Sequence, residues 1–328
     1  MKRFTSRIRA ALMLAMPAAL LATAALPAAA DSYPSQPVRL VVPFPPAGGT
    51  DVMARLVFNK VGASTHWNVV VENRAGAGGN IGMDAVAKAR PDGYTLGMGQ
   101  TANLAINPTL YPKMPYDAVK DFTPVALVSA QPLVLIVRGD APYKNLADLV
   151  AAGKARQLSM ASAGTGTVGH LTGELFARRT GIKMLHVPYK GASPALTDLL
   201  GGQTDFYFAT PPIALPMLKG GKLRALAVTS ARRLPLLADV PTVIEGGYAG
   251  FQAEDWKALV APAGTPAEVV RRVNEAVNKA IAEPETITRM REEGSEPRGG
   301  TPAELGAFIK AENARWGTIV RQSGAKVE

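Results

Sequence analysis

Short apolar runs alternate with helix-like stretches, and no other feature of the sequence limits the possible folds as strongly. The runs are bounded by turn residues and cover positions 38–43, 69–72, 95–98, 133–137, 158–161, 183–187, 206–208 and 223–228. Strands that alternate with helices are typical of βα units, in which successive strands lie parallel. The sequence therefore predicts an α/β fold built from mainly parallel sheets flanked by helices.

The first thirty residues have the pattern of a secretory signal peptide. Four basic residues and no acid occupy positions 1–9, an apolar run covers 10–26, and Ala28, Ala29 and Ala30 form a small-residue cleavage site. An uncleaved anchor is the alternative, but the run is short, Pro17 interrupts it, and no second apolar segment of about twenty residues follows. We expect cleavage before Asp31 and an exported, soluble protein.

Two domains are expected in the part of the chain after the leader. Of the 328 residues, roughly 300 remain, which is near the size at which one hydrophobic core stops growing. No flexible linker separates the domains, so residues 123–137 and 250–262 are predicted to cross between them. This gives lobe 1 from residues 31–130 plus 252–328, lobe 2 from 131–251, and a cleft between the lobes.

Two helices near the C-terminus begin with the same motif. Thr265-Pro266-Ala267-Glu268 and Thr301-Pro302-Ala303-Glu304 each combine a capping box with proline at the first helical position. Apolar residues then recur at helical spacing after both motifs. These segments are predicted to be structural helices of lobe 1.

The residues needed for catalysis or metal binding are sparse. The chain has no cysteine, and its histidines, His66, His170 and His186, lack the spacing of a metal site. The 36 basic residues exceed the 26 acidic ones, but they are scattered beside acids along helices, unlike the basic face of a nucleic-acid binder. We therefore expect no enzyme, no metal, no cofactor and no nucleic-acid partner.

A glycine-rich loop follows the apolar run at 158–161. Residues 164–169 read G-x-G-x-x-G, a pattern of dinucleotide-binding folds, but the acid expected about twenty residues later is missing. The loop does supply backbone N–H groups at the start of a helix, which favour any anion, carboxylate included. The predicted ligand-binding residues here are Ser162, Gly164, Thr165, Gly166 and Thr167.

A second loop of the same kind, residues 43–51, follows the first apolar run and precedes a helix. Its predicted ligand-binding residues are Phe44, Pro45, Gly48, Gly49 and Thr50. One such loop in each lobe would place two helix N-termini on opposite walls of the cleft. Further polar contacts are expected from Thr101 and Asn103, and Lys190 is the nearest cationic candidate.

Several motifs together resemble the Bug-type solute-binding proteins of tripartite tricarboxylate transporters. They are Pro43-Phe44-Pro45-Pro46-Ala47-Gly48-Gly49-Thr50-Asp51, Val71-Glu72-Asn73-Arg74-Ala75-Gly76-Ala77-Gly78-Gly79-Asn80-Ile81-Gly82, Pro91-Asp92-Gly93-Tyr94-Thr95 and Pro188-Tyr189-Lys190-Gly191. The resemblance implies a periplasmic, type II-like two-lobed binding protein. It also implies that the ligand lies between residues 44–50 and residues 162–167, held largely by backbone amides.

The resemblance also implies the function and the partners. It predicts a receptor, acting as a monomer, that closes on a small organic carboxylate and delivers it to the large and small integral-membrane subunits of a transporter. The alternative is an enzyme with a nucleotide cofactor in the glycine loop, similar to a Rossmann-type dehydrogenase. The sequence leaves open whether the ligand is a mono-, di- or tricarboxylate.

Overall fold

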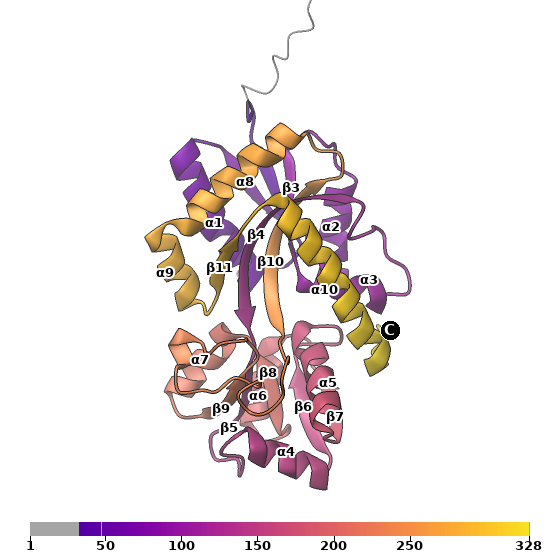
Figure 1. The fold of residues 1–328 in the computed structure, drawn as a ribbon, viewed down its shortest axis with the longest axis vertical. Helices are drawn as coiled ribbons and strands as arrows, with labels where there is room; N and C mark the ends of the chain where they lie inside the picture. Colours follow the sequence, from indigo (N-terminus) through magenta and orange to yellow (C-terminus); the bar gives the residue numbers. More distant parts are fainter. Residues whose placement is uncertain (1–32, 47, 328) are drawn as a thin grey trace, which may run out of the picture. The chain divides into compact units, whose positions relative to one another are not determined.

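The computed structural model describes residues 33–46 and 48–327. The predicted signal peptide, residues 1–30, lies outside the described residues. Pro34–Glu328 forms one compact unit, and Figure 1 shows its two groups of strands. In the described part of the chain, no helix combines the length and the apolar character needed to cross a membrane.

The first group of strands is a six-stranded sheet, sheet A, in the order β11-β4-β10-β3-β1-β2. Its strands are β1 (Val38–Val42), β2 (Val69–Asn73), β3 (Thr95–Gln100), β4 (Phe122–Pro132), β10 (Glu254–Pro262) and β11 (Glu296–Gly299). The helices near it are α1 (Gly49–Thr65), α2 (Asn80–Ala87), α3 (Asn107–Leu110), α8 (Ala267–Ala282), α9 (Pro284–Glu292) and α10 (Pro302–Ser323), with two shorter turns, η1 (Ala77–Gly79) and η2 (Ala102–Ile106).

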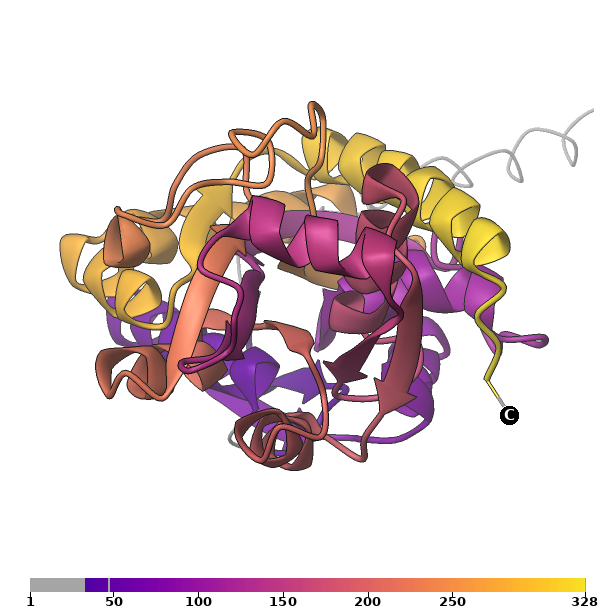
Figure 2. The same ribbon diagram turned by 90° about the horizontal axis from the view of Figure 1, so that it is seen from below.

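The second group is a five-stranded sheet, sheet B, in the order β7-β6-β8-β5-β9. Its strands are β5 (Val134–Arg138), β6 (Leu158–Ser162), β7 (Met184–Pro188), β8 (Phe206–Ala209) and β9 (Leu223–Val228). Its helices are α4 (Leu146–Ala155), α5 (Val168–Thr180), α6 (Ala192–Leu200) and α7 (Pro211–Lys219), and the turn η3 (Pro235–Leu237) follows β9 (Figure 2).

Both sheets are mixed, whereas the sequence predicted mainly parallel ones. The parallel pairs are β1 with β2 and β3, and β6 with β7 and β8. The remaining pairs are antiparallel, and each of them includes β4, β5, β10 or β11. Three of these strands, β4, β5 and β10, adjoin the crossings between the sheets. The expected βα units therefore exist, but crossing strands complete each sheet in the opposite direction.

Two segments connect the sheets, and one threonine joins them. Only Leu133 separates β4 in sheet A from β5 in sheet B. The buried Thr229 accepts a hydrogen bond from the Leu133 N–H through Oγ1 at 2.8 Å, and its backbone N–H donates to the Leu133 carbonyl at 3.0 Å. On the returning segment, the Ala253 N–H donates to the Thr229 carbonyl at 3.0 Å, and Oγ1 donates to the Ala253 carbonyl at 2.5 Å. We call these three residues the crossing clasp.

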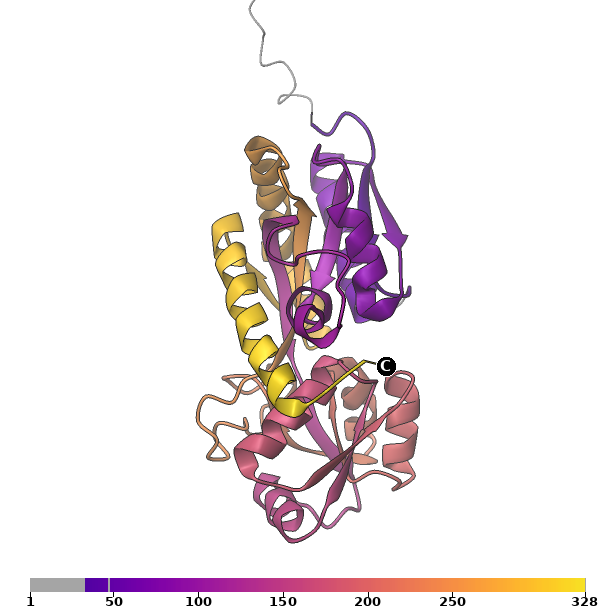
Figure 3. The ribbon, with the colours of Figure 1, turned by 90° about the vertical axis from the view of Figure 1, so that its right-hand side faces the viewer.

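The last helix also reaches from one sheet to the other. α10 packs on β4 and on α5 of the second group, as Figure 3 shows. Near its end, the Arg178 Nη1 of α5 donates to the Gln322 carbonyl of α10 at 3.3 Å. In the described chain, a contact between helices thus joins the two groups of strands in addition to the two connecting segments.

The capping motifs of the two late helices have different outcomes. Thr301 caps α10 as predicted, because its Oγ1 accepts from the Glu304 N–H at 3.2 Å and the Glu304 carboxylate accepts from the Thr301 N–H at 2.7 Å. The prediction for Thr265 is wrong, because α8 begins after Pro266 and Thr265 Oγ1 donates backwards to the Pro262 carbonyl at 2.8 Å. The Thr265 hydroxyl is bonded within the tight turn at the end of β10 and therefore does not cap α8.

Replacing Thr229 with valine tests the crossing clasp. The substitution keeps the shape of the side chain but leaves the buried Leu133 N–H without its acceptor, so we expect the free energy of unfolding to fall by about 1–3 kcal/mol. Urea unfolding followed by circular dichroism measures the change. The control is Thr318→Val at an exposed position of α10. The Thr318 hydroxyl donates to the Ala314 carbonyl, and its loss should change stability by less than about 0.5 kcal/mol. Equal losses of stability in Thr229→Val and Thr318→Val would contradict the stabilising role of the crossing clasp.

Candidate functional site

A cavity of about 210 Å³ lies where the loops of sheet A meet those of sheet B. Residues that follow strands of sheet A line one side, among them Phe44, Gly78, Gln100 and Asn107. The other side is formed by the start of α5 and by residues of sheet B and α7, namely Ala163, Thr165, Gly166, Thr167, Val168, Gly169, Tyr207, Phe208 and Thr210. The two predicted loops therefore contribute to one hollow.

A second hollow of about 310 Å³ lies between α1 and α9, and the lysine that lines it is already paired. Lys60 Nζ forms ion pairs with Glu283 at 3.0 Å and Glu285 at 2.7 Å. None of the described residues of the two predicted loops lines this hollow. We therefore place the candidate site in the cavity between the two sheets.

Free amides at the start of α5 are the main polar feature of the cavity. Thr167 caps the helix, with its Oγ1 accepting from the His170 N–H at 3.3 Å. Within the described chain, the N–H groups of Thr165, Val168 and Gly169 have no hydrogen-bond partner, and all three residues line the cavity. Unpaired N–H groups and the helix dipole together favour a negatively charged group.

Other groups of this loop are used to hold its shape. The Gly164 N–H donates to Ser162 Oγ at 3.1 Å, the Gly166 N–H to His170 Nδ1 at 3.1 Å, and the Thr167 N–H to the Gly164 carbonyl at 3.3 Å. Gly164 and Gly166 adopt φ values of +136° and +79°, which favour glycine. Of the predicted residues, Thr165, Gly166 and Thr167 line the cavity, whereas Ser162 and Gly164 support it from behind.

Sequence reasoning missed Val168 and Gly169, although a signal for them was present. Gly169 is the last glycine of the G-x-G-x-x-G pattern. A Cβ at this position would come within 2.7 Å of the Phe208 carbonyl oxygen, so glycine lets α5 approach β8 closely. The pattern therefore does predict how the helix N-terminus is brought to the cavity, even without a nucleotide.

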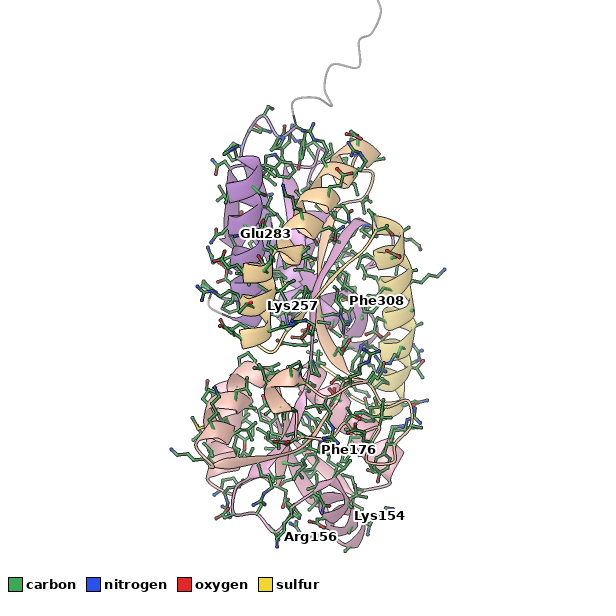
Figure 4. The ribbon with its side chains drawn as sticks, turned by 60° about the vertical axis from the view of Figure 1, so that its left-hand side comes forward. Lys154, Arg156, Phe176, Lys257, Glu283 and Phe308 are labelled. Carbon is green, nitrogen blue, oxygen red and sulfur yellow. The ribbon has the colours of Figure 1, made fainter. Side chains whose placement is uncertain are left out.

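Aromatic packing fixes the position of α5. The Phe176 ring, labelled in Figure 4, lies in the group of strands that forms sheet B. It contacts the rings of Phe206, Phe208 and Phe251 edge-on, at centroid distances of 6.3, 5.5 and 6.1 Å. Phe208 itself lines the cavity. Because cores are densely packed, this cluster keeps the N-terminus of α5 at the cavity wall.

A stacked pair of histidines holds the glycine loop. The rings of His170 and His186 lie 3.7 Å apart between centroids. His170 Nδ1 accepts from the Gly166 N–H, and His186 Nε2 and Ser162 Oγ share a hydrogen bond of 2.6 Å. His170 Nε2 also lies 3.6 Å from Glu174 Oε1. Both imidazoles thus serve the loop as structural supports.

The first loop contributes less to the cavity than predicted. Phe44 lines it, but Pro45, Gly48, Gly49 and Thr50 do not, and Ala47 is outside the described residues. Thr50 Oγ1 donates to Gln100 Oε1, and Gln100 is itself a lining residue that the sequence did not indicate. The loop is held by Asn73, whose Nδ2 donates to the Phe44 carbonyl at 3.0 Å.

Thr101 and Asn103 are buried behind the wall and do not line the cavity. Thr101 Oγ1 accepts from the Trp256 N–H at 2.9 Å and thereby joins the end of β3 to β10. Asn103 Oδ1 accepts from the Gln100 N–H at 3.0 Å, while Asn103 Nδ2 has no partner in the described chain. Their predicted contact with a ligand stays a prediction.

The cavity is nearly without charge. Among the lining residues of the described chain there is no lysine or arginine, and Asp255 carries the one carboxylate. Lys190 is exposed and outside the lining. Burial raises the pKa of the lining Tyr207 to about 12, so this phenol stays protonated near neutral pH. The described residues also contain no cluster of three His, Cys, Asp or Glu side chains suited to a metal ion.

Comparison with known proteins agrees with this arrangement. A family model described as "Tripartite tricarboxylate transporter family receptor" (TctC) matches residues 53–325. BugT of Bordetella pertussis is 40% identical over 321 residues, which are 96% of this chain and 98% of BugT. The chain belongs to the TctC receptor family.

Solved structures of TctC-like proteins share the fold. One described as a periplasmic transporter has a TM-score of 0.81 and 38% identity, covering 90% of this chain and 100% of the other. R. palustris Rpa4515, solved with adipate, has a TM-score of 0.81, 37% identity and the same coverage. These similarities confirm the predicted family, the two-lobed periplasmic-binding-protein fold and a receptor rather than an enzyme.

The stacked histidines make the stability of this TctC receptor dependent on pH. Burial, together with the neighbouring His170, lowers the pKa of His186 to about 4. The unfolded chain binds this proton near pH 6.5, whereas the folded chain does not until about pH 4, so stability is lost as the pH falls through that window. In His186→Gln the melting temperature should therefore decrease less between pH 7 and pH 4.5.

Calorimetry at several pH values measures this difference. His66→Asn, at the exposed end of α1, is the control and should keep the wild-type profile. A wild-type slope in His186→Gln would show that this half-buried imidazole is not the source of the acid sensitivity.

Proposed function

We propose that this protein is an exported receptor that binds a small organic carboxylate in the cavity between its two sheets and delivers it to a membrane transporter. The observation that supports this most directly is the set of unpaired N–H groups at Thr165, Val168 and Gly169, facing a cavity without a basic side chain. A carboxylate held there would be bound by main-chain nitrogens and by the α5 dipole.

The size of the cavity suits a small organic acid. Its volume is about 210 Å³, and mono-, di- and tricarboxylates all remain candidates. The relative Rpa4515 was solved with adipate, an acid with an aliphatic chain between its carboxylates. The apolar wall from Phe44, Leu110 and Phe208 suits its carbon chain.

The expected binding energy is adequate without a cation. Each hydrogen bond to a charged group contributes about 1.5–3 kcal/mol net, and a helix terminus adds about 0.3–2 kcal/mol. Three such bonds at the start of α5, with apolar contact, offset the entropy of association and reach the roughly 8 kcal/mol of a micromolar complex.

The division into lobes at residues 130/131 and 251/252 stays our proposal, and the crossing clasp supports it. Both boundaries lie next to residues that Thr229 binds, Leu133 and Ala253. Rotation about this point would open and close the cavity. The two sides already lie close together, because a Cβ on Gly166 would be only 2.2 Å from Leu110 Cδ2.

Export and partners belong to the same proposal. Solved relatives are described as periplasmic, and the predicted leader at residues 1–30 would direct this chain there. The family description implies a tripartite transporter, whose large and small membrane subunits would receive the ligand from the monomeric receptor.

Thermal melting with a panel of compounds tests the proposed function. A ligand that binds the folded state stabilises it by about 2.7 kcal/mol at a concentration of 100 times its Kd. We expect one or more small carboxylates to raise the melting temperature, and nicotinamide and adenine nucleotides to leave it unchanged. A shift with nucleotides alone would instead support the cofactor-binding enzyme.

Gly166→Ala tests whether the glycine loop forms the binding site. The new Cβ meets Leu110 and pushes it within the cavity, so we expect carboxylate affinity to fall about tenfold or more, equal to at least about 1.4 kcal/mol. Gly181→Ala is the matched control: its φ of +73° is equally left-handed, but nothing lies within 4 Å of the added Cβ. Both variants should lose stability through the left-handed φ, Gly166→Ala somewhat more because Leu110 must move, and isothermal titration should show weaker binding in Gly166→Ala alone. Unchanged affinity would place the ligand elsewhere.

A further inference from the structure

We propose that Asp255 makes the receptor selective for acids that carry a hydrogen-bond donor, a hydroxyl or an ammonium, in addition to the carboxylate held at α5. This inference rests on the proposed function and specifies its ligand class. It starts from the one acidic side chain in a cavity suited to anions.

Asp255 lies at the crossing between the sheets, opposite Gln131 in the pairing of β10 with β4. Its Oδ2 accepts from Lys257 Nζ at 2.9 Å and from Gln131 Nε2 at 3.3 Å. The amide of Gln131 is in turn oriented by Ser295, whose Oγ donates to Gln131 Oε1 at 3.0 Å. Oδ2 is therefore held in place from two sides.

The second oxygen of this carboxylate is unused. Within the described chain, Asp255 Oδ1 is buried and has no hydrogen-bond partner. Buried acceptors are nearly always paired, so an unpaired one beside a ligand cavity suggests that the ligand provides the donor. The side chain keeps 14% of its surface exposed and lines the cavity, so Oδ1 would meet a ligand once the carboxylate turns about its terminal bond.

The charge around Asp255 favours a donor over a second carboxylate. Lys257 is 1% exposed and lies on the same face of β10, two residues along, where Figure 4 shows it among the strands of sheet A. Its ammonium is paired with Asp255, so it is not available to a ligand carboxylate placed beside that oxygen. A second ligand carboxylate would have no donor to offer to Asp255 Oδ1, and its negative charge would be repelled by that of Asp255.

The cavity thus has two unlike ends. The start of α5 offers N–H donors and binds the carboxylate, whereas Asp255 offers an acceptor. A hydroxy acid or amino acid matches both ends. A simple dicarboxylate matches one, even though a relative was solved with adipate.

Acids that differ only in their terminal group test this selectivity. Four-carbon and six-carbon acids ending in methyl, hydroxyl, ammonium or carboxylate are titrated into the wild-type protein by calorimetry. We expect a donor-terminated acid to bind about tenfold more tightly, or better, than the methyl and dicarboxylate members of its series. Comparison of the hydroxyl and ammonium members identifies the donor.

The double variant Asp255→Asn/Lys257→Met removes the ion pair without leaving a buried charge unpaired. In this variant, the affinity for the donor-terminated acid divided by the affinity for the dicarboxylate should fall at least about fivefold. Asp140→Asn, in an exposed pair with Arg138, should keep the wild-type ratio. A ratio of affinities is the readout because a general structural defect weakens all members equally.

The outcomes separate the two proposals. If the dicarboxylate binds wild type as tightly as the donor-terminated acids, or if the double variant keeps the wild-type ratio, the role of Asp255 is refuted while the receptor function stands. If no carboxylate binds at all, the proposed function fails and this inference fails with it.

Discussion

The rest of the structure depends on the hydrogen bonds that the Thr229 hydroxyl makes to Leu133 and Ala253. A chain that passes from one sheet to the other through a single residue must satisfy its backbone groups there without a strand partner, and Thr229 does this for both crossings. The clasp keeps β4, β5 and β10 in register at the junction. That register determines where α5 and Asp255 lie, and so it determines the geometry of the cavity.

The cavity is built by a division of roles within each loop. Ser162 and His170 accept hydrogen bonds from backbone N–H groups of the loop before α5, and Asn73 donates to a carbonyl of the first loop. A few N–H groups at the start of α5 stay unpaired within the described chain. Preorganised donors need no rearrangement when an anion arrives, so the proposed binding of a carboxylate at α5 would not require arginine or lysine. The two histidines have the same scaffolding role and add a dependence on pH through His186.

Much of the fold could be predicted from the sequence, because strands, loops and helix starts leave local signals; the family and the receptor function followed from the motifs. β11 was missed because Glu296–Gly299 has no apolar pattern and depends on pairing with β4. Thr265 and Thr301 share a motif but differ in outcome, since a neighbouring turn engages Thr265. Side-chain direction is not local information either, so the sequence could not show that Thr101 and Asn103 are buried behind the wall or that Asp255 lines the cavity.

The order of the strands along the chain has a consequence for folding. Sheet B is assembled from one continuous stretch, β5 to β9, and its contacts can form as soon as that stretch is available. Sheet A needs β10 and β11, which lie far along the chain from β1, and such distant contacts form slowly. In a chain that emerges from its N-terminus, β1–β3 therefore appear first but sheet B can be completed first. The edge of β3 then stays open until the C-terminal strand β10 arrives.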